Sequence, residues 1–271
     1  MKRVLKSPTP QMLQKYISID PNASWQQMRD DNNRGGYQTA HVCRDQAIRD
    51  QYGLCAYCEQ KMILEKEITP EESLHCRVEH FHPKSDRNEE HNWDLDWENM
   101  LAVCDGGSVS TKEQKESFPL PKNLSCDAHK ERKMNRSITC EGFLLNPLDI
   151  PSFPNIFKLD KGTGYFEPDE NTCGAVDILI NNYATTVELV NNTIEILNLN
   201  CDRLTEKRLL LVRNIEHNKK SLRQKGISAA DMPGKLIQRY FTDRWPAFFT
   251  TLRCCIGPAV EEHLKSINYQ G

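Results

Sequence analysis

The sequence predicts an α+β protein that is mostly α-helical, with a small β-containing core between two helical segments. Residues 1–50 carry apolar side chains at helical spacing, as in PTPQMLQKYI and TAHVCRDQAIRDQYG. Residues 51–140 hold short β-like runs, LHCRVEHF and NMLAVC, between polar loops. Residues 141–271 begin with a proline-rich connector and then return to helical spacing in VELVNNTIEILNL and RLTEKRLLLVRNIEHNKKSL. We therefore expect three segments, with boundaries near residues 50 and 140.

The composition is that of a soluble globular protein. The chain has 271 residues, of which 38% are hydrophobic and 27% charged. It has no run of about 20 apolar residues, the length that a membrane helix needs. The start, MKRVLKSPTP, lacks the apolar segment of a secretory signal. We therefore expect a cytoplasmic protein without a membrane segment.

The charge and the cysteine count narrow the function. The formal net charge is −3, so contact with nucleic acid would need a local basic patch or a partner. Eleven cysteines are many for a cytoplasmic chain, where disulfides are rare. Metal binding is therefore the favoured explanation for some of them.

Four of the cysteines have metal-ligand spacing. Cys55 and Cys58 form a C-x-x-C pair, which binds a tetrahedral zinc ion if two more ligands come from elsewhere. Cys104 and Cys126 supply those ligands if the polar stretch 105–125 loops out between them. The alternative is that either pair is simply buried. The other cysteines lack partner spacing and are expected in the core: Cys43, Cys76, Cys140, Cys173, Cys201, Cys254 and Cys255.

Acidic, imidazole and amide side chains lie between and after these cysteines. The stretch VEHFHPKS contains Glu79 and His80, WENML contains Asn99, and Asp127 and Lys130 follow the last cysteine. Together with the cysteines, these residues strongly resemble the HNH nucleases, whose ββα-metal core is often held by a zinc knuckle. Asp127 stands where that family commonly has asparagine. A carboxylate also binds a hard cation, so this difference preserves a metal site.

Further stretches narrow the resemblance. LCAYCEQK, VEHFHPKS and IEILNLNCDRLTEKR look like the nuclease subunit of the Septu anti-phage system, a nuclease type that also accompanies some retrons. The resemblance implies the effector of a defence complex with an ATPase partner, in some systems with a reverse transcriptase and its DNA–RNA product. The sequence has no P-loop pattern G-x-x-x-x-G-K-[ST], so an ATP switch of that kind would have to come from the partner. The helical region after about residue 175 is the expected docking surface.

The expected reaction is metal-dependent hydrolysis of phosphodiester bonds in nucleic acid. A histidine with a pKa near neutral can take a proton from water, and we assign that general base to His80. By the resemblance, Glu79 and Asp127 hold a Mg²⁺-like ion, and Asn99 holds the histidine loop through hydrogen bonds. Lys130 either faces the phosphate, as the resemblance implies, or is a solvated helix lysine.

The roles of two histidines and of one basic segment each have two interpretations. His82 shares a strand face with His80, so it either contacts the metal or phosphate or lies exposed in a loop. His129 is either a substrate contact or an exposed helix residue. The basic segment 203–225 either tracks a nucleic-acid backbone or is the solvated face of an amphipathic helix.

Two other classes of protein compete with the nuclease. A non-catalytic zinc module that binds nucleic acid or a partner would keep the cysteines but would not need a base beside two carboxylates. An enzyme with a cysteine nucleophile has the cysteines but no flanking signature, so it ranks last.

Overall fold

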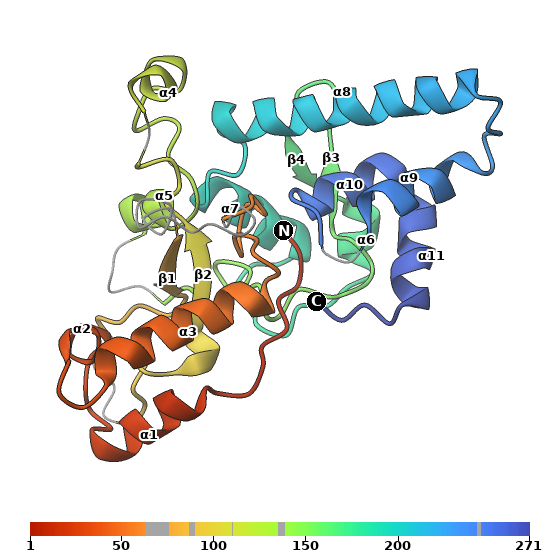
Figure 1. Ribbon diagram of the computed structural model, residues 1–271. Helices are drawn as coiled ribbons and strands as arrows, with labels where there is room; N and C mark the ends of the chain where they lie inside the picture. The colour runs from red at the N-terminus through yellow and green to blue at the C-terminus, as the bar shows by residue number, and fades with distance from the viewer. Residues whose placement is uncertain (63–75, 87–89, 110, 135–138, 243–244) are drawn as a thin grey trace.

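The N-terminal segment is helical, as predicted (Figure 1). It comprises α1 Gln11–Ile19, α2 Trp25–Asp30 and α3 Gly36–Asp50. The Ser24 side chain accepts a hydrogen bond from the backbone of Gln27, and the Gln27 side chain bonds back to the Ser24 backbone, so the start of α2 is fixed by a capping box. The computed structural model describes residues 1–62, 76–86, 90–109, 111–134, 139–242 and 245–271.

The central segment forms a two-stranded antiparallel sheet and a helix. The β-like runs predicted from the sequence become β1 Cys76–His80 and β2 Met100–Cys104, with Glu79 opposite Leu101. A 3₁₀ turn, η2 Trp97–Asn99, leads into β2. Helix α5, Cys126–Lys133, packs against β2. The order strand, strand, helix therefore brings residues from three separate stretches of sequence together.

The polar stretch 105–125 leaves the body of the protein and returns, as predicted. It also contains a short helix, α4 Lys112–Ser117, which projects away from the rest of the chain (Figure 1). The excursion closes where the backbone N–H of Ser125 donates to the carbonyl of Gly106 at 2.9 Å. A Cβ atom at position 106 would lie 2.1 Å from the Ser125 carbonyl oxygen, and φ is +65° there. Only glycine fits this close approach, which sets the end of β2 beside the start of α5.

The connector contains structure that the sequence did not predict. Strands β3 Phe157–Leu159 and β4 Phe166–Pro168 pair in an antiparallel hairpin, followed by helix α6 Glu170–Gly174. Strands of three residues are too short to show a clear alternation of apolar and polar side chains. The hairpin packs against two helices of the C-terminal segment, so it belongs to the packed interior of this region.

The C-terminal segment is a set of packed helices, as predicted. These are α7 Thr186–Ile196, α8 Asp202–Gln224, α9 Met232–Tyr240, α10 Phe249–Ile256 and α11 Pro258–Ser266. Leu204, Val212 and Ile215 of α8 are buried, as their spacing indicated. The mostly helical α+β class is therefore confirmed.

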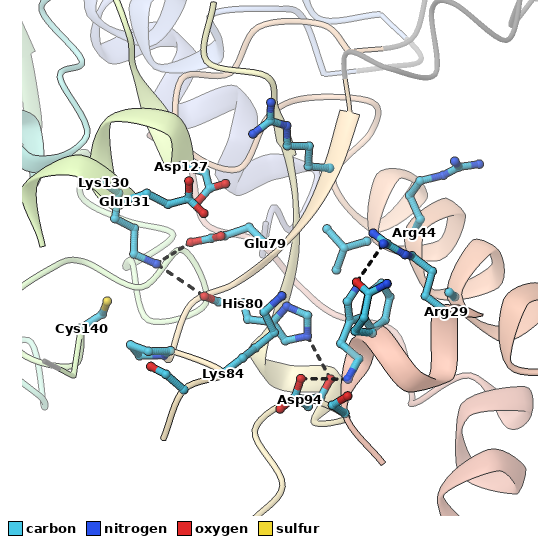
Figure 2. A pocket seen from close by; sticks show the side chains of 18 of the residues that line it. Arg29, Arg44, Glu79, His80, Lys84, Asp94, Asp127, Lys130, Glu131 and Cys140 are labelled. Carbon is cyan, nitrogen blue, oxygen red and sulfur yellow. Dashed lines mark hydrogen bonds and ion pairs between the residues drawn. The ribbon is translucent and has the colours of Figure 1, made fainter. Parts of the chain in front are cut away.

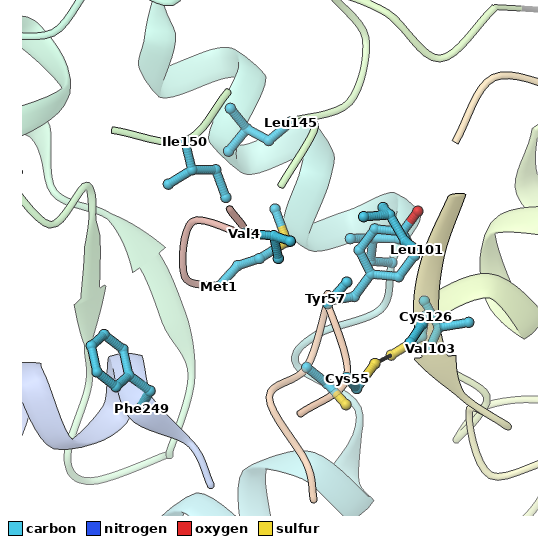
Figure 3. Packing of buried hydrophobic residues seen from close by; sticks show 14 of the residues in the cluster. Met1, Val4, Cys55, Tyr57, Leu101, Val103, Cys126, Leu145, Ile150 and Phe249 are labelled. Carbon is cyan, nitrogen blue, oxygen red and sulfur yellow. Dashed lines mark hydrogen bonds between the residues drawn. The ribbon is translucent and has the colours of Figure 1, made fainter. Parts of the chain in front are cut away.

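One buried apolar cluster joins the three segments. It includes the first residue, Met1, together with Leu101 on β2, Leu145 in the connector and Phe249 on α10 (Figure 3). Because this cluster is continuous, the segment boundaries near residues 50 and 140 stay predictions. Within the described ranges, none of the helices has both the length and the apolar character needed to cross a membrane.

Candidate active site and cysteine cluster

The four cysteines with metal-ligand spacing lie together and are buried. The sulfur atoms of Cys55, Cys58, Cys104 and Cys126 all lie within 4.8 Å of one another. The Sγ–Sγ distances are 3.8 Å for Cys55–Cys126, 3.7 Å for Cys58–Cys104 and 3.8 Å for Cys104–Cys126. A tetrahedral zinc ion with Zn–S bonds of about 2.3 Å separates its ligands by about 3.8 Å. The cluster therefore fits a tetrahedral metal ion (Figure 3 shows Cys55 and Cys126).

The tight turn that carries Cys55 and Cys58 is held in place by hydrogen bonds to helix α10, near the C-terminus. The backbone N–H of Glu59 donates to the carbonyl of Cys55 at 3.0 Å. The buried Glu59 carboxylate accepts hydrogen bonds from the backbone N–H (2.8 Å) and the hydroxyl (2.5 Å) of Thr250, in α10. The C-terminal helices therefore support the geometry of the cysteine cluster.

Helix α8 places positive charge next to the cysteines. Arg203 donates to the hydroxyl of Ser125 at 2.7 Å. Burial alone would lower the pKa of Arg203, but the negative charges of the surrounding cysteine thiolates, Cys58 first among them, together outweigh it and raise the pKa. Arg203 is half-buried, and Arg208 is completely buried. Within the basic segment 203–225, Arg203 and Arg208 therefore belong to the packed interior, because Arg203 bonds to Ser125 and Arg208 bonds to the carbonyls of Gly164 and Leu199.

Two carboxylates meet beside the sheet, as the metal-site prediction requires. Glu79 on β1 and Asp127 in the first turn of α5 are both buried, with exposed fractions of 7%. Burial, followed by the adjacent charge of Glu79, raises the pKa of Asp127 to about 8. A divalent cation between the two groups would relieve this repulsion, and carboxylate oxygens are the ligands that Mg²⁺ prefers. The pair therefore fits a hard divalent cation.

His80 is the last residue of β1, and its ring points toward Asp94 (Figure 2). One hydrogen bond defines the tautomer of this ring. Its Nε2 atom is 3.0 Å from the carbonyl oxygen of Asp94. A carbonyl can only accept, so Nε2 carries the proton and Nδ1 keeps its lone pair. Nδ1 is buried and has no hydrogen-bond partner within the part of the chain that the structure describes. His80 can therefore accept a proton at Nδ1.

The pKa of His80 differs from the near-neutral value expected from the sequence. Burial, followed by the nearby charge of Lys84, lowers this pKa to about 3. The Trp25 ring, which packs edge-on against His80 with ring centroids 5.2 Å apart, contributes to that burial. In this state the imidazole is neutral, and its lone pair is not blocked by a proton.

Lys130 is neither solvated nor turned outward. Its exposed fraction is 7%, and its ammonium group donates to Glu79 and, at 3.0 Å, to the carbonyl of Phe81 (Figure 2 shows the Glu79 contact). Burial alone would lower the pKa of Lys130, but the charge and hydrogen bond of Glu79, together with the charges of Cys140 and Asp127, raise it overall. The geometry supports a role in positioning Glu79 and the end of β1.

Asn99 holds the loop after β1, as the resemblance implied. Its side-chain oxygen accepts from the backbone N–H of His82 at 2.6 Å, and its amide donates to the carbonyls of His82 (3.1 Å) and Trp93 (2.9 Å). These hydrogen bonds join both sides of the loop. Asn99 therefore fixes the backbone that follows His80.

His82 and His129 are both held by contacts with other parts of the protein. The His82 ring is buried, stacks on Trp93, and lies between Glu141 (3.0 Å) and Asp86 (2.9 Å). His129 is half-buried, with Nδ1 2.8 Å from the carbonyl oxygen of Ile196 in α7. Neither His82 nor His129 is among the residues that line the cleft with the paired carboxylates, and a role for either in the reaction stays a prediction.

A cleft of about 750 Å³ contains the reactive groups. Glu79, His80, Asp127 and Lys130 all line it. Helices α2 and α3 form the wall on the other side (Figure 2). Neighbouring strand residues with opposite directions, Glu79 and His80, share one site because every residue of β1, Cys76–His80, lines the cleft.

Sequence reasoning missed three residues that support this site. Trp25 and Asp94 surround His80, and Tyr57 donates from its hydroxyl to Glu79 at 3.4 Å. Tyr57 lies between Cys55 and Cys58, and only this position in the sequence could have indicated that it is near the site. Trp25 and Asp94 had none, because a backbone carbonyl and a buried ring leave no pattern in the sequence.

Comparison with known proteins agrees with the motif. No family model matches the chain. The chain is 36% identical over 219 residues to an Escherichia coli protein described as "Retron Ec83 putative HNH endonuclease", and the match covers 78% of this chain and 79% of that protein. The chain therefore belongs to the HNH endonuclease family, and the resemblance to a retron-associated HNH endonuclease is confirmed.

Proposed function

We propose that this HNH endonuclease hydrolyses phosphodiester bonds in nucleic acid as the effector of an anti-phage defence complex. The main observation in support of this reaction is that His80, Glu79 and Asp127 line one cleft. His80 Nδ1 has no hydrogen-bond partner among the described residues, so its lone pair can accept a proton beside the paired carboxylates. A binding module would not need a base beside two metal-ligand carboxylates. The arrangement therefore favours the enzyme over a non-catalytic zinc module.

The residues divide the chemistry among them. Glu79 and Asp127 would hold a Mg²⁺-like ion, which supplies charge neutralisation at the phosphate and at the departing oxygen. His80 accepts the proton of the attacking water at Nδ1, while the carbonyl of Asp94 keeps the ring in the required tautomer. Lys130 positions Glu79. Each group acts from a buried or hydrogen-bonded position, so little reorganisation is needed when the substrate binds.

The cysteine cluster has a structural role in this proposal. Zinc at Cys55, Cys58, Cys104 and Cys126 would join the turn before β1, the end of β2 and the start of α5. Tyr57, between the first two cysteines, reaches Glu79. Zinc binding would thereby set the distance between the two carboxylates.

The partners follow from the resemblance and from the printed description of the relative, which names a retron. We propose an ATPase subunit as the partner that licenses cleavage, as in Septu, with a reverse transcriptase and its DNA–RNA product in a retron setting. The exposed outer part of α8 is the proposed docking surface, because the first turn of this helix bonds through Arg203 to Ser125, next to Cys126 of the cysteine cluster. Exposed residues there are Arg213, Lys220, Arg223 and Lys225.

Cleavage by the wild-type chain and by His80→Ala tests the proposal. Both proteins are incubated with labelled DNA and with total RNA, with and without the partner ATPase, in the presence of Mg²⁺. We expect the wild type to cut weakly alone and His80→Ala to lose about 10²–10⁴-fold, the usual contribution of a general base. His91→Ala is the matched control, since His91 is exposed and bonds to Asp96 at 2.9 Å. Binding without cleavage by the wild type under every condition would favour the zinc module instead.

A further inference from the structure

The wall of the cleft that faces the carboxylates is basic. Arg29 on α2 and Arg44 on α3 line the cleft. Figure 2 shows both side chains across the cleft from Glu79 and Asp127. The overall charge of the chain is −3, so any grip on a polyanion has to come from local groups such as these.

These two arginines are available to a ligand. Arg29 Nε lies 3.6 Å from Asp30 Oδ1, and the Arg29 guanidinium also donates to the Gln26 side chain at 2.8 Å. Arg44 donates to Asp45 Oδ1 at 2.9 Å. The arginine side chains themselves are 53% and 28% exposed. The two carboxylates have exposed side-chain fractions of 61% and 49%. Ion pairs at such exposure contribute little free energy. A phosphate, which accepts bidentate hydrogen bonds from a guanidinium group, can therefore replace or share either partner.

Asp94 and Trp25 connect helix α2, which carries Arg29, to His80, the proposed general base. The backbone N–H of Trp25, the first residue of α2, donates to the Asp94 carboxylate at 2.8 Å. The carbonyl of the same Asp94 accepts from His80 Nε2 at 3.0 Å. Trp25 also packs edge-on against the His80 ring. The position of α2 relative to His80 is therefore fixed by direct contacts.

We propose that Arg29 and Arg44 bind backbone phosphates of the nucleic-acid substrate and hold the strand in register with His80. This inference rests on the proposed nuclease function and extends it to α2 and α3, for which the sequence indicated no role beyond packing. Phosphate contacts of this kind position a strand without reading its sequence. The wall therefore contributes affinity and register, and the reaction itself stays with the groups on the other side of the cleft.

The test measures binding separately from cleavage. The full chain carries His80→Ala, so that the probe stays intact, and binds fluorescein-labelled single-stranded DNA, single-stranded RNA and duplex DNA of one sequence. Fluorescence anisotropy gives the affinity at several salt concentrations. For the double variant Arg29→Gln/Arg44→Gln we expect weaker binding and a salt slope that is smaller by about 1.4 on single strands or about 1.8 on duplex DNA, which corresponds to two lost phosphate contacts.

The control removes the same charge elsewhere on the N-terminal helices. Lys15→Gln/Arg49→Gln changes two exposed residues, on α1 and α3, that do not line the cleft. Zinc content and thermal unfolding confirm that each protein is folded. An unchanged salt slope in the arginine variant, an equal loss in the control, or no binding by the parent protein would overturn the proposal. If the wild type cleaves normally in these cases, the nuclease assignment survives without the basic wall.

Discussion

Replacing Cys58 by serine should remove the metal ion from the cysteine cluster. The wild-type chain should contain one zinc ion held by four sulfurs, because the observed Sγ–Sγ distances of 3.7 and 3.8 Å match a tetrahedron of Zn–S bonds of about 2.3 Å. Serine cannot supply a thiolate at this position. The remaining three cysteines would be left with an incomplete coordination sphere.

The energetic consequence is large relative to the stability of the protein. Structural zinc contributes about 10–16 kcal/mol of binding free energy in zinc-finger peptides. A typical domain has a net unfolding free energy of about 5–15 kcal/mol, so even partial loss of zinc binding is comparable to the whole. In addition, the half-buried Arg203 and the buried Arg208 would have fewer thiolates near them. We therefore expect the sheet, α5 and the start of α8 to lose their protection from hydrogen exchange together.

Three measurements check this expectation. Elemental analysis gives the zinc content, X-ray absorption gives the ligand type and distance, and hydrogen exchange maps the destabilised region. Cys254→Ser is the matched control: Cys254 lies outside the cluster, and its thiol donates to the Phe157 carbonyl at 3.3 Å, which a serine hydroxyl can also do. Well under one zinc per wild-type chain, or Cys58→Ser with normal zinc content and unchanged melting, would refute the reasoning.

Two further predictions concern the residues around the carboxylates. Asn99→Ala should lower the unfolding free energy by about 1.5–4.5 kcal/mol, since three hydrogen bonds of about 0.5–1.5 kcal/mol each are lost, and should slow cleavage more than an exposed control such as His91→Ala does. Wild-type stability in urea denaturation would contradict it. Lys130→Met should destabilise the metal-free protein by about 3–5 kcal/mol, because it leaves the buried Glu79 carboxylate without its cation. Added Mg²⁺ should raise the melting temperature more in Lys130→Met than in the wild type, and an equal rise in both would argue against a cation site at Glu79.

Local sequence patterns predicted much of the fold and of the candidate site. Helical periodicity identified the helical ends of the chain, because it depends on residues three or four positions apart. The C-x-x-C spacing predicted a cysteine cluster, and the resemblance to HNH nucleases implied a site with a base and two carboxylates. The cysteine cluster forms as expected, and the family is confirmed by a relative with 36% identity.

The sequence by itself therefore determined the helical segments and the cysteine set, since each depends on spacing along the chain, and the grouping of Glu79, Asp127 and His80 was implied by the resemblance to HNH nucleases. Only the tertiary structure decided where these groups point. The close approach of Gly106 and Ser125 closes the 105–125 excursion, and burial turns Lys130 toward Glu79. The carbonyl of Asp94 selects the tautomer of His80. These outcomes depend on backbone groups and on contacts between distant parts of the chain, which leave no local pattern in the sequence.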